Sequence, residues 1–284
     1  MKPLLLLLCL FSLSMYGQKP PAVHFNHLFF VIDSADLAAL RNSTFVKNKL
    51  AALIVRTTKV DNNTTWTGTY LEGIDNYIEI FDSAGVGAPV GYAGIGFGVD
   101  SVGELAQMNA ILSQKYKTDT WLREKQYGDK KIPWFNNLQI ADSVFDSLSH
   151  FSFWVMEYRK EYYDYNHWKY KNNKLTRTTY LNQFAKERQN KILKRFTGLT
   201  LKVTDLERQM LSGFMLSCGY RQIDADSFAS PDNFEIHLIT RNENDRAAMV
   251  SVEFECNKPQ NENLPISKGV EVKLQGKKGV VIFK

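Results

Sequence analysis

The stretch HFNHLFFVID, residues 24–33, determines how the rest of the chain is interpreted. Apolar or aromatic residues fill nearly every position, which is typical of a β-strand covered on both faces. Asp33 or Ser34 then caps a helix, and apolar residues continue through position 53. Three further strands are predicted at 54–59, 65–72 and 77–81. The order in this unit is therefore strand, helix, strand, strand, strand.

Two later stretches open in the same way. GIGFGVD, residues 94–100, ends in Asp-Ser before an amphipathic helix predicted at 102–116. Strands are predicted near 120–125 and 132–138, and at 151–158 (FSFWVMEY). A third opening has a strand at 199–204, a helix at 206–217 and strand candidates at 234–240, 249–256, 270–274 and 280–283. Three such openings indicate internal duplication, with chance similarity of short units as the alternative.

The composition excludes several classes of protein. With 284 residues, 44% of them hydrophobic, the chain is long enough for a substantial core and is not disordered, collagen-like or a coiled coil. A net charge of +5 is too small for a protein that coats nucleic acid. The sequence has no Gly-x-Ser-x-Gly, His-Glu-x-x-His or Cys-x-x-Cys motif, and Gly94, Gly96 and Gly98 do not form a dinucleotide-binding turn.

The N-terminus predicts export. Lys2 precedes an apolar run at 4–13 that is too short to span a membrane, so residues 1–17 are predicted to be a signal peptide cleaved after Gly17. Residues 18–23 are then a linker, and an uncleaved anchor is the alternative. We expect a soluble periplasmic or secreted protein.

Cleavage would leave Cys218 and Cys256 in an oxidising compartment. They either form one disulfide or remain two buried free thiols.

Residues 159–195 differ from the rest in composition. They hold eleven Lys or Arg against three acidic residues, a net charge of +8, interleaved with six Tyr or Trp. We expect this basic connector to be solvated and partly helical, with its aromatic side chains on the domain surface. Contact with an anionic lipid or glycan surface is the alternative, and export argues against nucleic acid as a partner.

The segments FNHLFFVID (25–33), YIEIFD (77–82) and GLTLKVTDLE (198–207) resemble the glyoxalase-like, or vicinal oxygen chelate, superfamily. The likeness is greatest to exported bacterial glyoxalase-like proteins. It implies an α+β fold of repeated βαβββ modules that form open half-barrel sheets. Applied to this chain, it implies a paired unit at 24–158 and a third module at 196–284, and the resemblance does not extend to the helical basic connector at 159–195 between them.

The resemblance also implies a metal site inside the half-barrel, with His27 and Glu79 as ligands from the first module and Glu157 from the second. Glu79 and Glu157 are the expected proton-transfer residues, and the metal would be manganese, iron, nickel or zinc. The position that matches His27 in the second unit is Gly94, which cannot bind metal. Either three ligands suffice, or the site is metal-free and Gly94, Gly96 and Gly98 accommodate an organic ligand.

Three functions remain open from the sequence. The first is an exported protein that binds a small molecule, with or without a divalent metal. The second is a metal-dependent lyase, isomerase or dioxygenase, for which a second His of a facial triad is missing. The third is an envelope interaction protein that uses the basic connector. Neither the ligand nor the oligomeric state follows from the sequence.

Overall fold

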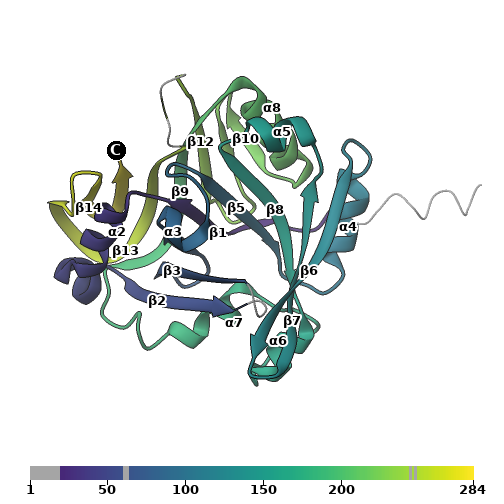
Figure 1. Ribbon diagram of the computed structural model, residues 1–284, viewed down its shortest axis with the longest axis horizontal. Helices are drawn as coiled ribbons and strands as arrows, with labels where there is room; N and C mark the ends of the chain where they lie inside the picture. The colour runs from purple at the N-terminus through teal and green to yellow at the C-terminus, as the bar shows by residue number, and fades with distance from the viewer. Residues whose placement is uncertain (1–19, 60–63, 243–244, 246–247) are drawn as a thin grey trace, which may run out of the picture.

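The strands of the protein form two sheets, seen in a computed structural model that describes residues 20–59, 64–242, 245 and 248–284 (Figure 1). The predicted signal peptide, 1–17, lies outside the described residues. No helix of the described ranges is long and apolar enough to cross a membrane.

The eight-stranded sheet has the strand order β2-β3-β4-β1-β5-β8-β7-β6. Its strands are β1 (His24–Val31), β2 (Ala52–Lys59), β3 (Thr65–Glu72), β4 (Tyr77–Phe81), β5 (Ala93–Val99), β6 (Thr118–Tyr127), β7 (Lys130–Ile140) and β8 (Phe151–Tyr158). The helices of this part are α2 (Ser34–Asn42), η1 (Val46–Leu50), α3 (Ser83–Val86), α4 (Glu104–Leu112) and α5 (Ser143–Leu148).

This strand order is that of two βαβββ modules side by side. The first strand of each module pairs in parallel with its last, β1 with β4 and β5 with β8. The modules join where β1 and β5 run antiparallel. The edge strands β2 and β6 come into contact, so the sheet curls into a half-barrel. The predicted α+β fold with paired modules is confirmed.

The six-stranded sheet has the order β10-β11-β12-β9-β13-β14 and repeats the module once more. Its elements are β9 (Leu193–Val203), α8 (Asp205–Ser217), β10 (Arg221–Asp224), β11 (Ser227–Ala229), β12 (Glu235–Thr240), β13 (Met249–Pro265) and β14 (Val270–Phe283). β10 and β11 were not predicted, because they are only four and three residues long. The strands predicted at 270–274 and 280–283 are one strand, which continues through Gly276 at a φ of 59°.

Side-chain caps explain where two of the helices start. The Asp33 carboxylate accepts a hydrogen bond from the backbone N of Ala35, which confirms Asp33 as the cap of α2. Helix α8 begins one residue before the predicted 206–217 and is capped by Thr204, in a capping box with Glu207. Helix α4 is shorter than the predicted 102–116 and begins after Gly103, which has a positive φ.

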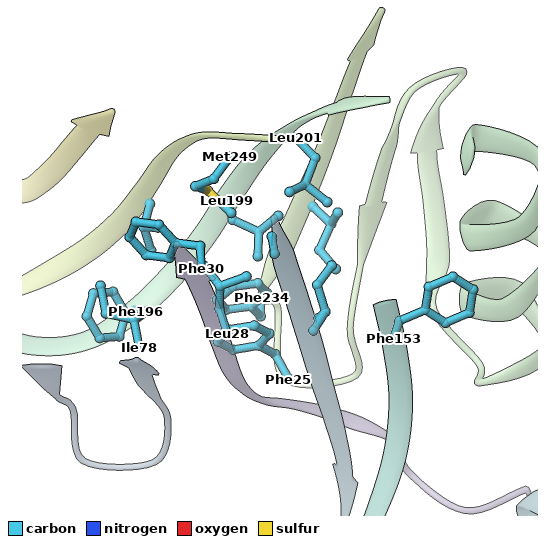
Figure 2. Packing of buried hydrophobic residues seen from close by; sticks show 14 of the residues in the cluster. Phe25, Leu28, Phe30, Ile78, Phe153, Phe196, Leu199, Leu201, Phe234 and Met249 are labelled. Carbon is cyan, nitrogen blue, oxygen red and sulfur yellow. The ribbon is translucent and has the colours of Figure 1, made fainter. Parts of the chain in front are cut away.

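One hydrophobic core lies between the two sheets. The rings of Phe25 from β1 and Phe234 stack with centroids 3.8 Å apart, and Figure 2 shows Leu28 and Phe30 facing residues of the six-stranded sheet. Cys218 and Cys256 belong to this core as free thiols, so the disulfide alternative is not realised in this structure.

The basic connector is helical in part, with α6 (Lys160–Tyr165), α7 (Arg177–Leu181) and a short 3-10 turn, η2 (Asn182–Phe184). Three of its six Tyr and Trp side chains are not on the surface as expected, whereas Tyr165 is 39% exposed. Tyr162, Tyr163 and Tyr180 are at most 2% exposed and pack with residues of β3, β4, β7 and β8. The rings of Tyr180 and Tyr158 stack at 4.9 Å. The connector thus fills the end of the half-barrel at which β8 finishes.

Candidate functional site

A cavity of about 410 Å³ lies inside the half-barrel, at the end that the connector leaves open. Aromatic side chains from six strands make most of its wall: Phe29, Trp66, Tyr77, Phe81, Trp121, Trp134, Phe135 and Trp154. Polar side chains, among them His27, Glu79, Arg123 and Asn137, are set between the rings. We call this space the half-barrel cavity.

His27 lines this cavity as predicted, and its ring is held in place. Its Nδ1 lies 3.0 Å from the Asn26 side-chain oxygen, and its ring stacks on Tyr77 with centroids 4.9 Å apart. Because an amide oxygen only accepts, the ring hydrogen is on Nδ1, which leaves Nε2 as an acceptor. Burial lowers the pKa of His27 to about 3. The imidazole is therefore neutral at physiological pH.

Glu79 also lines the cavity, next to His27. In the parallel pairing of β1 with β4, His27 lies opposite Tyr77 and Phe29 opposite Glu79, so both side chains project from one face. Burial raises the pKa of Glu79 to about 7, against the opposing effects of Arg56 and a hydrogen bond with Tyr77. This carboxyl can hold or release a proton near neutral pH.

Glu72 provides a second carboxyl near Glu79. Glu72 is 1% exposed, and neither of its carboxyl oxygens has a hydrogen-bond partner among the described residues. Burial raises its pKa to about 8, with Arg56 acting in the opposite direction. The guanidinium of Arg56 lies 3.9 Å above the ring of Tyr70. The sequence analysis did not identify either residue as part of a site.

Glu157 does not join His27 and Glu79, and its assignment to the site was wrong. Its Oε2 accepts hydrogen bonds from the backbone N of Gly103 and of Leu105, each at 2.9 Å, at the start of α4. The β5–β8 pairing sets Trp154 opposite Gly96, which makes Trp154 the counterpart of Glu79. Glu157 is three residues further on, and an odd offset on a strand moves the side chain to the other face.

The donor set of the half-barrel cavity does not fit the expected metal. Of the three predicted ligands only His27 and Glu79 line it. Within the described part of the chain, no three His, Cys, Asp or Glu side chains group closely enough to hold an ion. A facial triad needs two His and a carboxylate, and the second module offers Ser152 and Trp154 on the matching face.

The glycine face of β5 is covered by side chains of β1. A Cβ added to Gly94 would come within 2.1 Å of the Phe29 ring, and one added to Gly96 within 2.4 Å of the His27 ring. A Cβ at Gly98 would approach Asn26 at 2.9 Å. The three glycines are therefore needed because side chains of β1 lie close against β5, and their role in ligand binding stays a prediction.

Most residues of the cavity wall were not predicted from the sequence. Trp121, Trp134 and Trp154 come from the second module, whose strands were assigned without a site. The alternation of Trp121 with Arg123, and of Phe135 with Asn137 and Gln139, is a period-2 signal that indicates one shared face. This periodicity could have predicted that these residues share one face of the sheet. No local sequence pattern indicates that the face is concave.

Several buried polar atoms of this region have no hydrogen-bond partner among the described residues. They include Nε1 of Trp134, Nε1 of Trp154 and Oδ1 of Asn137, all from residues that line the cavity. Buried polar groups are nearly always hydrogen-bonded in proteins, so each such atom calls for an explanation. A bound molecule or ordered water in the cavity would supply the missing partners.

A larger cleft, of about 600 Å³, lies on the six-stranded sheet. Its wall is formed mainly by charged residues of β12, β13 and β14, including Glu235, Glu253, Lys273 and Lys278. None of its lining atoms is a buried polar atom without a partner. These features are those of a solvated sheet face, so we take the half-barrel cavity as the candidate site.

Comparison with solved structures finds distant likenesses. A hypothetical protein from Staphylococcus aureus aligns with a TM-score of 0.48 and 11% identity, over 80% of this chain and 88% of that one. A xylose isomerase-like TIM barrel/4-hydroxyphenylpyruvate dioxygenase fusion protein gives 0.44 and 13%, over 83% and 36%. A putative dioxygenase from Bacillus subtilis gives 0.31 and 10%, over 89% and 81%.

These TM-scores are too low to support a functional inference, and a search of curated proteins finds no match. A family description matches nearly all of the described chain, residues 25–283. The protein therefore belongs to DUF5829, a family of unknown function.

Proposed function

We propose that this protein binds a small organic molecule with an aromatic ring system in the half-barrel cavity. The observation that carries the proposal is the wall of that cavity, in which eight aromatic side chains surround about 410 Å³. Sites for small molecules are concave, mainly apolar and equipped with a few polar groups that orient the ligand. The unpartnered atoms of Trp134, Asn137 and Trp154 are such groups.

The proposal is for a site without a metal. His27 and Glu79 alone provide two ligands from one module, and Glu157 is bound to backbone N–H groups at α4. We therefore rank binding without a metal above a metal-dependent lyase, isomerase or dioxygenase. A stoichiometric divalent ion retained by the purified protein would contradict this ranking.

The envelope interaction proposed for the basic connector has less support. Tyr162, Tyr163 and Tyr180, which would have formed its aromatic surface, are buried. Several of its cations are paired, among them Lys160 with Asp164 and Arg195 with Asp75. We keep export as part of the proposal, because residues 1–17 have the features of a signal peptide, and place the binding activity in the periplasm or outside the cell.

Tryptophan fluorescence tests the proposal directly. Four of the five tryptophans, Trp66, Trp121, Trp134 and Trp154, line the cavity, and the fifth is Trp168 in the connector. Titration with naphthalene derivatives should therefore give a saturable change in emission. Ser152 lines the cavity, so Ser152→Phe should fill it and abolish the change.

The matched control is Ser251→Phe, at a half-buried position on β13 of the six-stranded sheet, which should bind as the wild type does. Saturable binding that persists unchanged in the Ser152→Phe protein would place the ligand elsewhere and overturn the proposal.

A further inference from the structure

Three cations meet at the seam of the half-barrel. Arg123 and Lys125 are on β6 and Arg56 is on β2, and these two edge strands come into contact where the sheet curls. Arg123 lines the half-barrel cavity. Burial, and after it the nearby charge of Arg56, lower the pKa of Lys125 to about 8. Residues more than sixty positions apart in the sequence thus form one positively charged group at the seam, and Arg123 is the member that lines the cavity.

None of these three cations has an ion-pair partner in the described part of the chain. Arg56 lies above the rings of Tyr70 and Phe184, at 3.9 and 5.4 Å. The Lys125 ammonium lies 5.2 Å from the ring of Trp134 and 3.4 Å from the hydroxyl of Tyr162. Arg123 is exposed and makes no hydrogen bond to the described residues. Its guanidinium is therefore available to a ligand.

The neighbouring acids offset little of this positive charge. Glu72 is buried and Glu79 is half-buried, and burial raises the pKa of Glu72 to about 8 and that of Glu79 to about 7. At neutral pH Glu72 is mainly protonated and Glu79 only partly ionised. The interior around Arg56, Arg123 and Lys125 therefore carries a net positive charge.

The unpartnered atoms also favour a ligand that accepts hydrogen bonds. The indole N–H groups of Trp134 and Trp154 are buried donors without partners among the described residues. With the guanidinium of Arg123 they give the cavity an excess of donors. On the acceptor side, Oδ1 of Asn137 is buried without a partner among the described residues, and Nε2 of His27 is a second acceptor of the cavity wall. Anionic oxygens are the groups that such donors bind best.

We infer that the ligand of the half-barrel cavity is an aromatic anion, whose ring lies among the tryptophans and whose carboxylate or phosphate is bound by Arg123 at the β2–β6 seam. This inference rests on the proposed function and adds the charge of the ligand to it. Arg123 supplies a planar pair of donors that match two oxygens of such a group.

The test uses three probes that share one ring: 2-naphthoate, 2-naphthyl phosphate and the neutral 2-naphthamide. Isothermal titration calorimetry on the mature protein should show that at least one anion binds ten-fold or more tightly than the amide. Raising sodium chloride from 0.05 to 0.5 M should weaken binding of the anion and leave the amide unchanged. The tighter of the two anions identifies the preferred group.

Arg123→Gln should weaken binding of the preferred anion about ten-fold and leave 2-naphthamide as it was. The matched control is Lys131→Gln, an exposed lysine on the neighbouring strand β7 that does not line the cavity. Equal binding of amide and anions, or an Arg123→Gln protein that binds the anion like wild type, would overturn the inference and leave the proposed function standing. If none of the three probes binds, both fail.

Discussion

The two sheets repeat one module but use its concave face differently. In each sheet, the last strand of the module runs parallel to the first strand, as β4 does to β1 and β12 does to β9. On its other side, the first strand pairs with an antiparallel strand, β5 next to β1 and β13 next to β9. The eight-stranded sheet adds a second module and curls until β2 meets β6. The six-stranded sheet ends in the β13–β14 hairpin and stays open.

This difference decides what each face can hold. The open face of the six-stranded sheet carries Glu235, Glu253 and Lys273, charged side chains that water can solvate. The half-barrel instead encloses Glu72 and Glu79 among aromatic rings, where burial raises the pKa values of both carboxyls. The curling of the sheet, rather than the βαβββ module itself, therefore makes a cavity.

The largest expected effect concerns the residue that joins the two regions. Arg177 of the connector donates from Nη1 to the backbone oxygen of Phe25 in β1, at 2.6 Å, and from Nη2 to Asp232, at 3.1 Å. Its Nε lies 3.6 Å from Asp100. Arg177→Met should lower the free energy of unfolding by about 3 kcal/mol, because it leaves two carboxylates without their cation.

Urea denaturation measures this loss, with Lys174→Met, an exposed lysine of the same connector, as the control. A loss of less than about 1 kcal/mol for Arg177→Met would show that the shared core, without this residue, holds the sheets together.

An intermediate effect is expected from adding a methyl group to a glycine of each sheet. In the eight-stranded sheet, Gly94→Ala would bring a Cβ within 2.1 Å of the Phe29 ring and should cost about 1–3 kcal/mol. In the six-stranded sheet, Gly198→Ala meets its nearest atom, the backbone oxygen of Glu235, at 3.1 Å and should cost less. Melting temperatures of both variants measure the difference.

A double-mutant cycle sharpens the Gly94 result. In a Phe29→Ala background, the ring that blocks the new methyl group is absent, so Gly94→Ala should become nearly neutral. An undiminished cost in that background would mean that the backbone of β5, and not the Phe29 ring, demands glycine.

The smallest change between one measured condition and the next is a dependence on pH. Glu72 has a pKa of about 8 in the folded protein against 4.5 for the free side chain. Between these values the folded protein retains a proton that the unfolded chain releases. Its contribution to stability is therefore full below pH 4.5 and is lost as the pH rises towards 8, by on the order of 1 kcal/mol per pH unit.

Glu72→Gln, which has a permanently neutral side chain, should lack this part of the decline, so that its stability relative to wild type rises from pH 5 to pH 8. Urea unfolding at several pH values measures it. Glu253→Gln on the open sheet is the matched control and should follow the wild-type curve. Parallel curves for wild type and Glu72→Gln would show that Glu72 is ionised in the folded protein.

Part of the site could be predicted from strand parity and part could not. His27 and Glu79 were placed on one face because β1 and β4 are regular, and both line the half-barrel cavity. Glu157 was matched to Glu79 because the residues around the two are similar. The β5–β8 register shows that the position equivalent to Glu79 in the second module is Trp154. Register depends on pairing between strands that are distant in the sequence, and the local sequence does not specify that pairing.

The surroundings of the β5 glycines and of the connector aromatics could not be predicted, for a related reason. Gly94 and Gly96 accommodate Phe29 and His27 from a strand almost seventy residues earlier. Tyr162 and Tyr180 were predicted to be solvated because lysines surround them in the sequence. Their rings instead belong to a buried cluster that includes Tyr158. In both cases a side chain from elsewhere in the chain determines what the position requires.

The sequence by itself determined the order of the modules, because apolar periodicity and helix caps such as Asp33 act over a few neighbouring residues. It also determined that His27 and Glu79 share a face with their aromatic neighbours. Only the tertiary structure decided that this face closes into a cavity, that the connector fills one end, and that Arg56, Arg123 and Lys125 meet at the seam. These features depend on sheet curvature and on packing between segments far apart in the chain, and no local pattern encodes them.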